Sequence, residues 1–391
     1  MHYLELGGAE TSLIGLLESI DYSRVDVDLF IYAHRGPLMQ HIPKQVRLLP
    51  EIKEYSLIEA PLKSVFRKGF LRLGTARLKA KLRHKRYLKR ADIKPGVEDY
   101  SIFGYIAYSV SHVLPDINPY VEYDLAVSFL TPHNYCLDHV RAKRKVAWIH
   151  TDYSLVHVDN ALEAPVWQAF DNIAAVSDDV ASKFIASFPD TAGKVLTIEN
   201  ILPKRYISAM SELNSEKIPE KGDLSILSIG RFTYPKNFES IPAIARKIVD
   251  KYGIDVRWYI MGYGSGYDLI LKCIHEHKME NNVIIIGPRT NPYPWIKACD
   301  IYVQPSRYEG KSVTVREAQL LYKPVVITDY PTSSSQINNG VDGIISSPAK
   351  IADCIVEVMR NNGLRSKIID HLSKHDYAFS EQVDKLYTLM S

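Results

Sequence analysis

Residues 306–329 read SRYEGKSVTVREAQLLYKPVVITD, and their pattern is the most informative about the architecture of the chain. The apolar strand DIYV at 300–303 precedes it, a helix begins near Ser312, and a second apolar strand, PVVIT at 324–328, follows. A helix that connects two buried strands predicts parallel pairing, because the crossover returns the chain to the same end of the sheet. The stretch therefore indicates an α/β fold.

The same alternation of strands and amphipathic helices covers most of the chain. Leu13, Leu16, Leu17 and Ile20 share one helical face, and Ile241, Ile244, Ala245 and Ile248 repeat the pattern. The candidate strands form two series, 27–33, 123–129, 145–149, 173–177 and 195–198, then 224–230, 255–262, 283–287, 300–303 and 324–328. Two such series predict two doubly wound parallel sheets in separate Rossmann-like domains.

A polar stretch without periodicity separates the two series. Residues 206–223 read as a linker, so we expect an N-terminal domain at 1–205 and a C-terminal domain at 224–370. The remaining segment, 371–391, is helical and is expected to pack back on the N-terminal domain. The chain thus has the length and pattern of a two-domain protein.

The beginning of the chain departs from this pattern. GGAE at residues 7–10 opens a helix at 9–20, yet only Met1 to Leu6 precede it. A central strand has about five or six residues, so MHYLEL is interpreted as the tail of a first strand whose natural start lies upstream.

Composition excludes several classes of protein. No run of 18 apolar residues and no cleavable signal peptide is present, so a cytoplasmic location is expected. The cysteines stand far apart without a CxxC pair, which supports neither a disulfide framework nor a zinc site.

Positive charge is concentrated in one segment. Residues 63–90 carry twelve Lys or Arg and no acid; of 48 basic residues in the chain, 36 remain outside it against 45 acidic ones, a balance of −9. Phe66, Phe70 and Leu73 stand at helical spacing there, with Leu78 and Leu82 further along. A cationic helix with an apolar stripe predicts peripheral contact with an anionic membrane; the alternative is a solvated helix or loop.

Two acids and a helix start form the most specific pattern. Glu309 and Glu317 have seven residues between them, and Gly310 follows the first. An acid before a helix, a glycine that permits close approach, and free amide groups at 311–314, from Lys311 through Ser312 and Val313 to Thr314, suit a polyol attached to an anion. A sugar nucleotide is such a ligand.

A second pattern is SIGRFTYPKN at 228–237. Arg231 and Lys236 follow Gly230 at the end of a predicted strand, where doubly wound sheets bind ligands. Two cations five residues apart can neutralise a diphosphate.

Together these motifs resemble the retaining glycosyltransferases of family 4, of the bacterial surface-polysaccharide type. SRYEG, REA and KPVV match the two-glutamate motif of that family, and Gly230, Arg231 and Lys236 match its diphosphate-binding loop. The resemblance implies the GT-B fold, in which two Rossmann-like domains face a cleft. It also implies that Glu309 holds hydroxyls of the transferred sugar and that Glu317 holds the ribose.

The resemblance extends to weaker motifs. His150, at the end of the strand in AWIHTDYS, would orient the sugar or stabilise positive charge at its anomeric carbon. Gly8 would approach the donor, and Gly262 and Gly264 would act as backbone spacers beneath it. The polar stretch SSSQI at 333–337 departs from the commoner glycine-rich version of that loop.

The resemblance implies a metal-independent hexosyltransferase. It would move a hexose from a nucleotide diphosphate sugar, a UDP-sugar being the donor we expect, to a saccharide or lipid-linked saccharide acceptor in polysaccharide biosynthesis. No cofactor, metal or nucleic-acid partner is expected. The alternatives are a GT-B-like sugar-nucleotide epimerase or phosphorylase, and a non-catalytic protein that binds sugar or nucleic acid.

Overall fold

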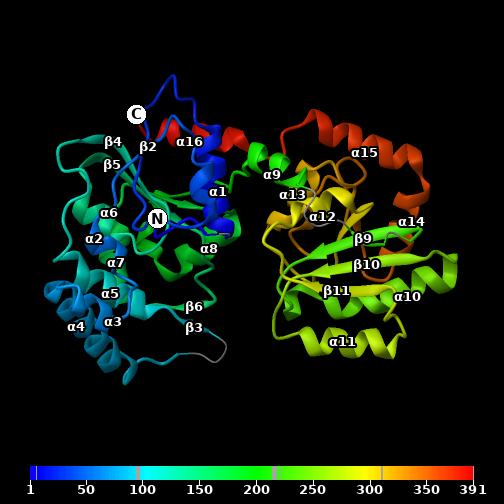
Figure 1. Cartoon of the computed structure of the whole chain (residues 1–391), viewed down its shortest axis with the longest axis horizontal. Coiled ribbons are helices and arrows are strands. Elements are labelled where there is room, and N and C mark those ends of the chain that lie inside the picture. Colours follow the sequence, from blue (N-terminus) through cyan, green and yellow to red (C-terminus); the bar gives the residue numbers. More distant parts are fainter. Residues whose placement is uncertain (6, 94–96, 214–217, 221, 310, 391) are drawn as a thin grey trace. The chain divides into compact units, whose positions relative to one another are not determined.

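The chain forms two α/β units in the computed structural model, coloured along the sequence in Figure 1. Unit 1 comprises Met1–Ile201 and Ser380–Ser391, and unit 2 comprises Leu202–Phe379. The structure describes residues 1–5, 7–93, 97–213, 218–220, 222–309 and 311–390. Both units contain parallel sheets, as the alternation of strands and helices predicts.

Unit 2 is built on a six-stranded sheet in which all recorded strand pairs are parallel. In spatial order the strands are β11 (Val283–Gly287), β10 (Val256–Met261), β9 (Leu224–Ile229), β12 (Ile301–Gln304), β13 (Val325–Thr328) and β14 (Ile344–Ser346). The chain order reverses between β9 and β12, and ligands of doubly wound sheets bind outside the carboxyl ends of the strands at such a point. The loops that follow β9 and β12 are therefore the place to look for a site.

Helices cover the sheet of unit 2 and bury its strands. They are α9 (Lys204–Ser211), α10 (Ile241–Tyr252), α11 (Tyr267–Glu276), α12 (Tyr293–Ala298), α13 (Val313–Leu320), α14 (Ile351–Arg360) and α15 (Asn362–Lys374). Ile226, Trp258 and Val303 are fully buried in one core with Ile241 and Ile355 of the helices. Continuous apolar runs such as VVIT fit these strands, because helices enclose a parallel sheet on both faces.

The strands of unit 1 fall into three groups. The largest is a parallel sheet in the order β4 (Tyr123–Ser128), β5 (Ala142–Ile149), β7 (Asn172–Ala175) and β8 (Val195–Thr197). Two-residue strands form the parallel pairs β1 (Asp28–Leu29) with β2 (Arg47–Leu48) and β3 (Glu98–Asp99) with β6 (Val156–His157). Within the described residues no strand pairs β1 with β4.

The helices of unit 1 include both ends of the chain. They are α1 (Gly8–Ser19), α2 (Lys53–Ser56), α3 (Leu62–Arg67), α4 (Leu71–Leu88), α5 (Ser101–Ser111), α6 (Asn134–His139), α7 (Asn160–Ala169), α8 (Asp178–Ser187) and α16 (Val383–Thr388). Lys385 of α16 donates to the Thr197 carbonyl at 2.7 Å, and Arg24 lies over the Tyr387 ring. The end of the chain thus returns to unit 1, which α16 joins beside α1 (Figure 1).

The segment between the two series of strands contains ordered structure. Helix α9 includes residues 206–211 of the predicted linker, and Asn291 donates to the Met210 carbonyl at 2.9 Å. Lys297 of α12 pairs with Glu212. Residues 206–212 therefore pack within unit 2, while 214–217 and 221 lie outside the described residues.

The basic segment is largely helical, but its apolar stripe differs from the predicted one. Leu73 is buried and Phe70 packs against the same core of unit 1, while Leu71, Leu78 and Leu82 of α4 are exposed. Of the twelve cations, Arg77 is buried and donates to the carbonyls of Leu57 and Ala60; the other eleven are exposed. Among the described residues, no helix has the length and hydropathy needed to cross a bilayer.

Candidate functional site

The loops after β9 and β12 are joined by hydrogen bonds at the switch point of unit 2. Asn237 has a left-handed backbone, with φ 56°, which turns the loop back toward the sheet. Its Nδ2 donates to the carbonyl oxygen of Pro305 at 3.0 Å, and Arg307 donates its backbone N–H to Pro235 at 2.8 Å. The two predicted motifs, 228–237 and 306–329, therefore meet in space.

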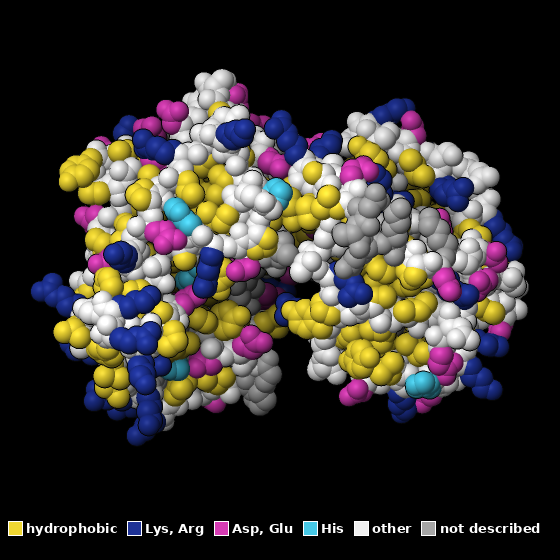
Figure 2. Space-filling view, viewed as in Figure 1, with side chains coloured by type: hydrophobic (Ala, Val, Ile, Leu, Met, Phe, Trp, Pro, Cys, Tyr) yellow, Lys and Arg dark blue, Asp and Glu magenta, His cyan; other side chains and the backbone are white. Residues whose placement is uncertain are grey.

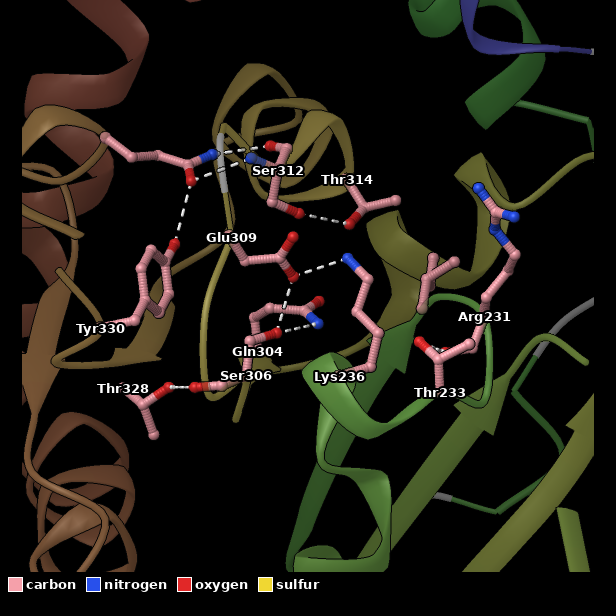
Figure 3. A network of polar contacts seen from close by, with 12 residues as sticks. Arg231, Thr233, Lys236, Gln304, Ser306, Glu309, Ser312, Thr314, Thr328 and Tyr330 are labelled. Carbon is pink, nitrogen blue, oxygen red and sulfur yellow. Dashed lines mark hydrogen bonds and ion pairs between the residues drawn. The ribbon is translucent and has the colours of Figure 1, made fainter. Parts of the chain in front are cut away.

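An ion pair connects the two motifs. Lys236 Nζ lies 2.6 Å from Glu309 Oε1, and the two side chains are 21% and 11% exposed. The hydroxyl of Ser306 donates to the same Glu309 oxygen at 2.6 Å (Figure 3). The sequence predicts Lys236 and Glu309 as separate contacts of one ligand. In the structure the two side chains contact each other, so that their charges are neutralised.

Arg231 contrasts with Lys236. Its side chain is exposed, and among the described residues no side-chain partner is recorded for it. Figure 3 shows its guanidinium apart from the Lys236–Glu309 network. Arg307, in contrast, pairs with Glu239 at 2.7 Å and stacks on Tyr234. Arg231 is therefore the cation of this loop that is available to an anionic ligand.

The start of α13 differs from the sequence-based expectation of free amide groups. The N–H of Ser312 donates to Gln336 Oε1 at 3.0 Å, and Gln336 Nε2 donates back to the Ser312 carbonyl at 2.6 Å. The Tyr330 hydroxyl donates a hydrogen bond to the same Gln336 oxygen at 3.0 Å. The Ser312 amide is thus occupied, whereas Val313 opens the helix, where backbone N–H groups lack an intrahelical acceptor.

Of the other residues expected at this helix start, Gly310 lies outside the described residues. The Lys311 side chain is half-buried.

Glu317 lies on the buried side of α13. The residue is 7% exposed, and its carboxylate accepts a hydrogen bond from the Tyr293 hydroxyl at 3.0 Å. Burial raises the pKa of Glu317 to about 7, and the Tyr293 hydrogen bond acts in the opposite direction. The carboxyl therefore titrates near neutral pH.

Gly262 and Gly264 allow the loop after β10 to pack on the Arg231 loop. Both have left-handed φ values, 145° and 151°. A Cβ on Gly262 would lie 1.9 Å from the Gly230 carbonyl oxygen, and one on Gly264 would lie 2.7 Å from the Phe232 nitrogen. Because these glycines lack a side chain, the loop after β10 packs directly on the backbone of Gly230 and Phe232; the predicted position of the two glycines beneath a donor stays a prediction.

His150 and Gly8 belong to unit 1. His150 follows β5, its ring packs 4.7 Å from that of Phe129, and its Nε2 is buried without a recorded partner. Burial lowers the pKa of His150 to about 4, against a weaker effect of the Phe129 backbone. The imidazole is therefore neutral at physiological pH. Gly8 is the first residue of α1, and a Cβ there would meet nothing within 4 Å.

Sequence reasoning missed the polar residues that hold the two motifs. Gln304 donates to Ser306 at 3.0 Å, and Tyr302 donates to Thr314 at 2.8 Å. Gln336 belongs to the stretch 333–337, whose polarity was the one available indication of its role. Over the described ranges, no group of three or more His, Cys, Asp or Glu side chains is arranged to ligate a metal ion.

Part of the chain, which includes these motifs, is similar to a known family. Residues 210–375 match the family model of the glycosyl transferases group 1. The poly(ribitol-phosphate) alpha-N-acetylglucosaminyltransferase of Staphylococcus aureus (strain COL) is 27% identical over 177 residues, 44% of this chain and 34% of that protein. A 4-alpha-N-acetylgalactosaminyltransferase of Campylobacter jejuni, named for a diacetylbacillosaminyl-diphospho-undecaprenol substrate, is 27% identical over 145 residues, 35% of this chain and 39% of that protein.

Solved structures share the fold over the whole chain. A mutant of S. aureus TarM, in complex with fondaparinux, alpha-GlcNAc-glycerol and UDP, superposes with a TM-score of 0.64 at 14% identity, covering 100% of this chain and 98% of that one. Anabaena HepE in complex with UDP and glucose gives 0.60 at 16% identity, covering 99% and 98%. The GT-B fold is therefore confirmed. The curated relatives match over only about a third of their own length (35%, 34% and 39%).

Proposed function

Because residues 210–375 are a domain of the glycosyl transferases group 1 family, we propose that the chain transfers a hexose from a nucleotide diphosphate sugar to a saccharide or lipid-linked saccharide. A UDP-sugar is the proposed donor. The observation that carries the proposal is the Lys236–Glu309 ion pair at the switch point of the unit 2 sheet, with the exposed Arg231 on the same loop as Lys236. The relatives support it, since they are named for transfer of N-acetylglucosamine and N-acetylgalactosamine, and two structural neighbours bind UDP.

The proposed chemistry begins with the leaving diphosphate. Arg231 is exposed and binds the incoming phosphates, while Lys236 leaves its pair with Glu309 to follow them. The two cations then stabilise the charge that develops on the diphosphate as the glycosidic bond breaks. On this proposal the residues of the chain supply the positive potential, and transfer does not require a metal ion.

Once Lys236 has left the ion pair, the carboxylate of Glu309 can bind the transferred sugar. Ser306 still donates to the freed carboxylate, whose second oxygen can accept a hydroxyl of the transferred sugar. Glu317 is assigned to the ribose; this contact requires access to a carboxyl that Tyr293 now covers. His150, as a neutral imidazole with an unpartnered Nε2, is assigned to orient the sugar.

Retention of configuration is proposed from the same residues. No second carboxylate is assigned as a nucleophile, so the acceptor attacks from the face that the diphosphate leaves. A diphosphate oxygen accepts the acceptor proton, which balances the transfer.

The exposed face of α4 is proposed to contact the membrane that carries a lipid-linked acceptor. Leu71, Leu78 and Leu82 are 61%, 47% and 53% exposed. Basic side chains surround them, and Figure 2 shows Lys and Arg gathered where Figure 1 places α4. An apolar stripe flanked by cations suits an anionic lipid surface.

The proposed donor is tested by thermal shift with UDP, GDP, ADP and TDP, followed by transfer assays with the matching sugar nucleotides. We expect UDP to give the largest stabilisation, and EDTA to leave transfer unchanged. Loss of all transfer in EDTA with recovery by Mg²⁺ would refute metal independence. Conversion of the donor without a new glycosidic bond would instead favour an epimerase.

A further inference from the structure

One oxygen of the Glu317 carboxyl is fixed by a protein hydrogen bond. Oε1 accepts from the Tyr293 hydroxyl at 3.0 Å, and among the described residues no partner is recorded for Oε2. Oε2 is also not one of the buried side-chain atoms that lack a partner, so an incoming group can reach it. The protein therefore occupies one oxygen of this carboxyl and leaves the other to accept a hydroxyl of a ligand.

Glu317 lies close to the Lys236–Glu309 pair along the chain and along α13. Val313 opens this helix, directly after the loop that carries Glu309, whose Oε1 lies 2.6 Å from Lys236 Nζ. Glu317 is four positions after Val313, so it lies on the same face of the helix, about one turn or 5.4 Å further along. This spacing suits a nucleoside diphosphate, in which the ribose is joined directly to the phosphates.

Several contacts fix the position of the Tyr293 hydroxyl. Tyr293 is the buried first residue of α12, and its backbone N–H donates to Asn291 Oδ1 at 3.2 Å. Asn291 donates in turn to the Met210 carbonyl of α9 at 2.9 Å. The ring of Tyr206, also in α9, meets the Tyr293 ring edge to face, with the centroids 5.9 Å apart. The Tyr293 ring is thus anchored on α9 while its hydroxyl bonds to α13.

The Tyr293 hydrogen bond is the interaction that favours the charged form of Glu317. Burial raises the pKa of Glu317 to about 7, this hydrogen bond opposes the rise, and no charged side chain of the described residues contributes to it. Burial and, less strongly, the charge of Glu317 raise the pKa of Tyr206, Tyr293 and Tyr302, which are therefore neutral at pH 8. An ionised carboxylate accepts hydroxyls more strongly than a neutral one.

From this geometry we propose that Tyr293 is a positioning residue for the ribose of the donor. Its hydroxyl occupies Oε1 of Glu317 and leaves Oε2 to accept a ribose hydroxyl. The inference rests on the proposed function, because it requires a nucleotide at unit 2, and it adds a residue that makes nucleotide binding depend on the ribose hydroxyls. A nucleotide without these hydroxyls leaves Oε2 without a partner in a buried position.

The test compares the binding of UDP and 2′,3′-dideoxy-UDP by calorimetry at pH 8, where Glu317, with a pKa of about 7, is ionised. We expect the wild type to bind UDP at least about tenfold more tightly. Tyr293→Phe should reduce this preference at least about threefold, while its affinity for dideoxy-UDP stays within about twofold of the wild type. Tyr252→Phe, which removes a tyrosine hydroxyl from the Asp353 carboxylate, is the matched control and should keep the full preference.

Two further measurements show whether Tyr293 acts through the carboxyl. In a Glu317→Gln background, Tyr293→Phe should cause no further loss of preference, because the group that it positions is gone. In the protein without nucleotide, carbon-13 NMR of the Glu317 carboxyl should give a titration midpoint near pH 7 in the wild type and a higher one in Tyr293→Phe. This second readout does not depend on nucleotide binding or on sugar transfer.

Each other outcome counts against the proposal. If Tyr293→Phe weakens UDP and dideoxy-UDP equally, or leaves the titration midpoint unmoved, the positioning role is overturned. A stronger preference for UDP in Tyr293→Phe would show that the hydroxyl competes with the ribose. Equal binding of both nucleotides by the wild type would refute the ribose contact and leave the nucleotide site in place. If the wild type binds neither, the proposed UDP donor is refuted, and the assignment of Tyr293 to its ribose fails with it.

Discussion

Lys236 and Glu309, 73 positions apart in the chain, meet with Nζ 2.6 Å from Oε1. The pair is mostly buried, so water screens it less than a surface ion pair. On the proposed mechanism, an anionic donor therefore has to separate the pair before Lys236 can act on its diphosphate. This relationship makes the two residues interdependent in any assay.

Replacing Lys236 tests its role directly. Lys236→Met should lower turnover at least about 10²-fold, because it removes a cation that acts on charge developed in the transition state. Lys272→Met, which removes a surface lysine paired with Glu276, is the control and should stay within about twofold. Initial rates at saturating donor measure the effect. Near-native turnover of Lys236→Met would remove this residue from the mechanism.

The Lys236–Glu309 coupling is measured by adding Glu309→Gln and the double variant. Since each single change leaves its partner without a counterion, the losses of folding stability should be non-additive by about 1 kcal/mol or more. Urea unfolding of the four proteins measures this coupling. Strictly additive losses would contradict the pair.

The pH dependence of stability reports on Glu317. Its pKa is raised from 4.5 to about 7, so the folded state binds a proton that the unfolded state has released. Stability from this carboxyl is present below pH 4.5 and is lost as pH rises to about 7, by about 3 kcal/mol. Glu317→Gln should remove that loss, whereas the exposed Glu357→Gln should retain it. Urea unfolding at pH 5 and pH 8 separates the two, and an unchanged difference in Glu317→Gln would refute the assignment.

His150 should act in the opposite pH direction. Its pKa is lowered from 6.5 to about 4, so the unfolded state binds the proton first. The stability of the neutral ring is complete above pH 6.5 and is lost toward pH 4, by about 3 kcal/mol. His150→Asn should remove most of the change in the free energy of unfolding between pH 6.5 and pH 4. Replacement of an exposed histidine, His112→Asn, should leave that change as it is in the wild type. If the free energy of unfolding of His150→Asn depends on pH as strongly as that of the wild type, the burial of the ring is contradicted.

Gly262 should tolerate no side chain. Gly262→Ala places a Cβ against the Gly230 carbonyl at a φ of 145°, so we expect a loss of about 2 kcal/mol or more. Gly193→Ala, where a Cβ meets no atom within 4 Å, should change stability by less than about 0.5 kcal/mol. Urea midpoints compare the two. Equal midpoints would mean that the loop after β10 can move away from Gly230 and accommodate a side chain, which would contradict the close packing of the two loops.

Charge reversal on α4 tests the membrane surface. Lys79→Glu with Arg83→Glu should weaken binding to anionic vesicles at least tenfold, because each cation near the surface contributes about 1 kcal/mol. Lys272→Glu with Lys367→Glu, in unit 2, is the matched control. Sedimentation with vesicles at low and high salt measures retention. Binding that ignores both charge and salt would refute the proposal.

Strands and helices could be predicted well from the sequence where their hydrophobic pattern is long and periodic. The strands predicted at 224–230, 255–262 and 283–287 lie within one residue of β9, β10 and β11. The prediction missed β14, because three residues carry too little pattern to distinguish them from a loop. It also assigned Leu73 to the stripe that faces the membrane, since spacing alone does not reveal which face of a helix meets a core.

The motifs that resemble those of glycosyltransferases could be recognised from the sequence because each is a short run with its own chemistry. Cations after a strand, an acid before a helix and glycines in a turn are local features, and so is the alternation that specifies two parallel-sheet units. Which of these groups come into contact could be learned from the folded chain alone. It paired Lys236 with Glu309, placed Gln336 on the Ser312 amide and buried Glu317. Such contacts join residues far apart in the chain, and their energies depend on burial, which no local pattern contains.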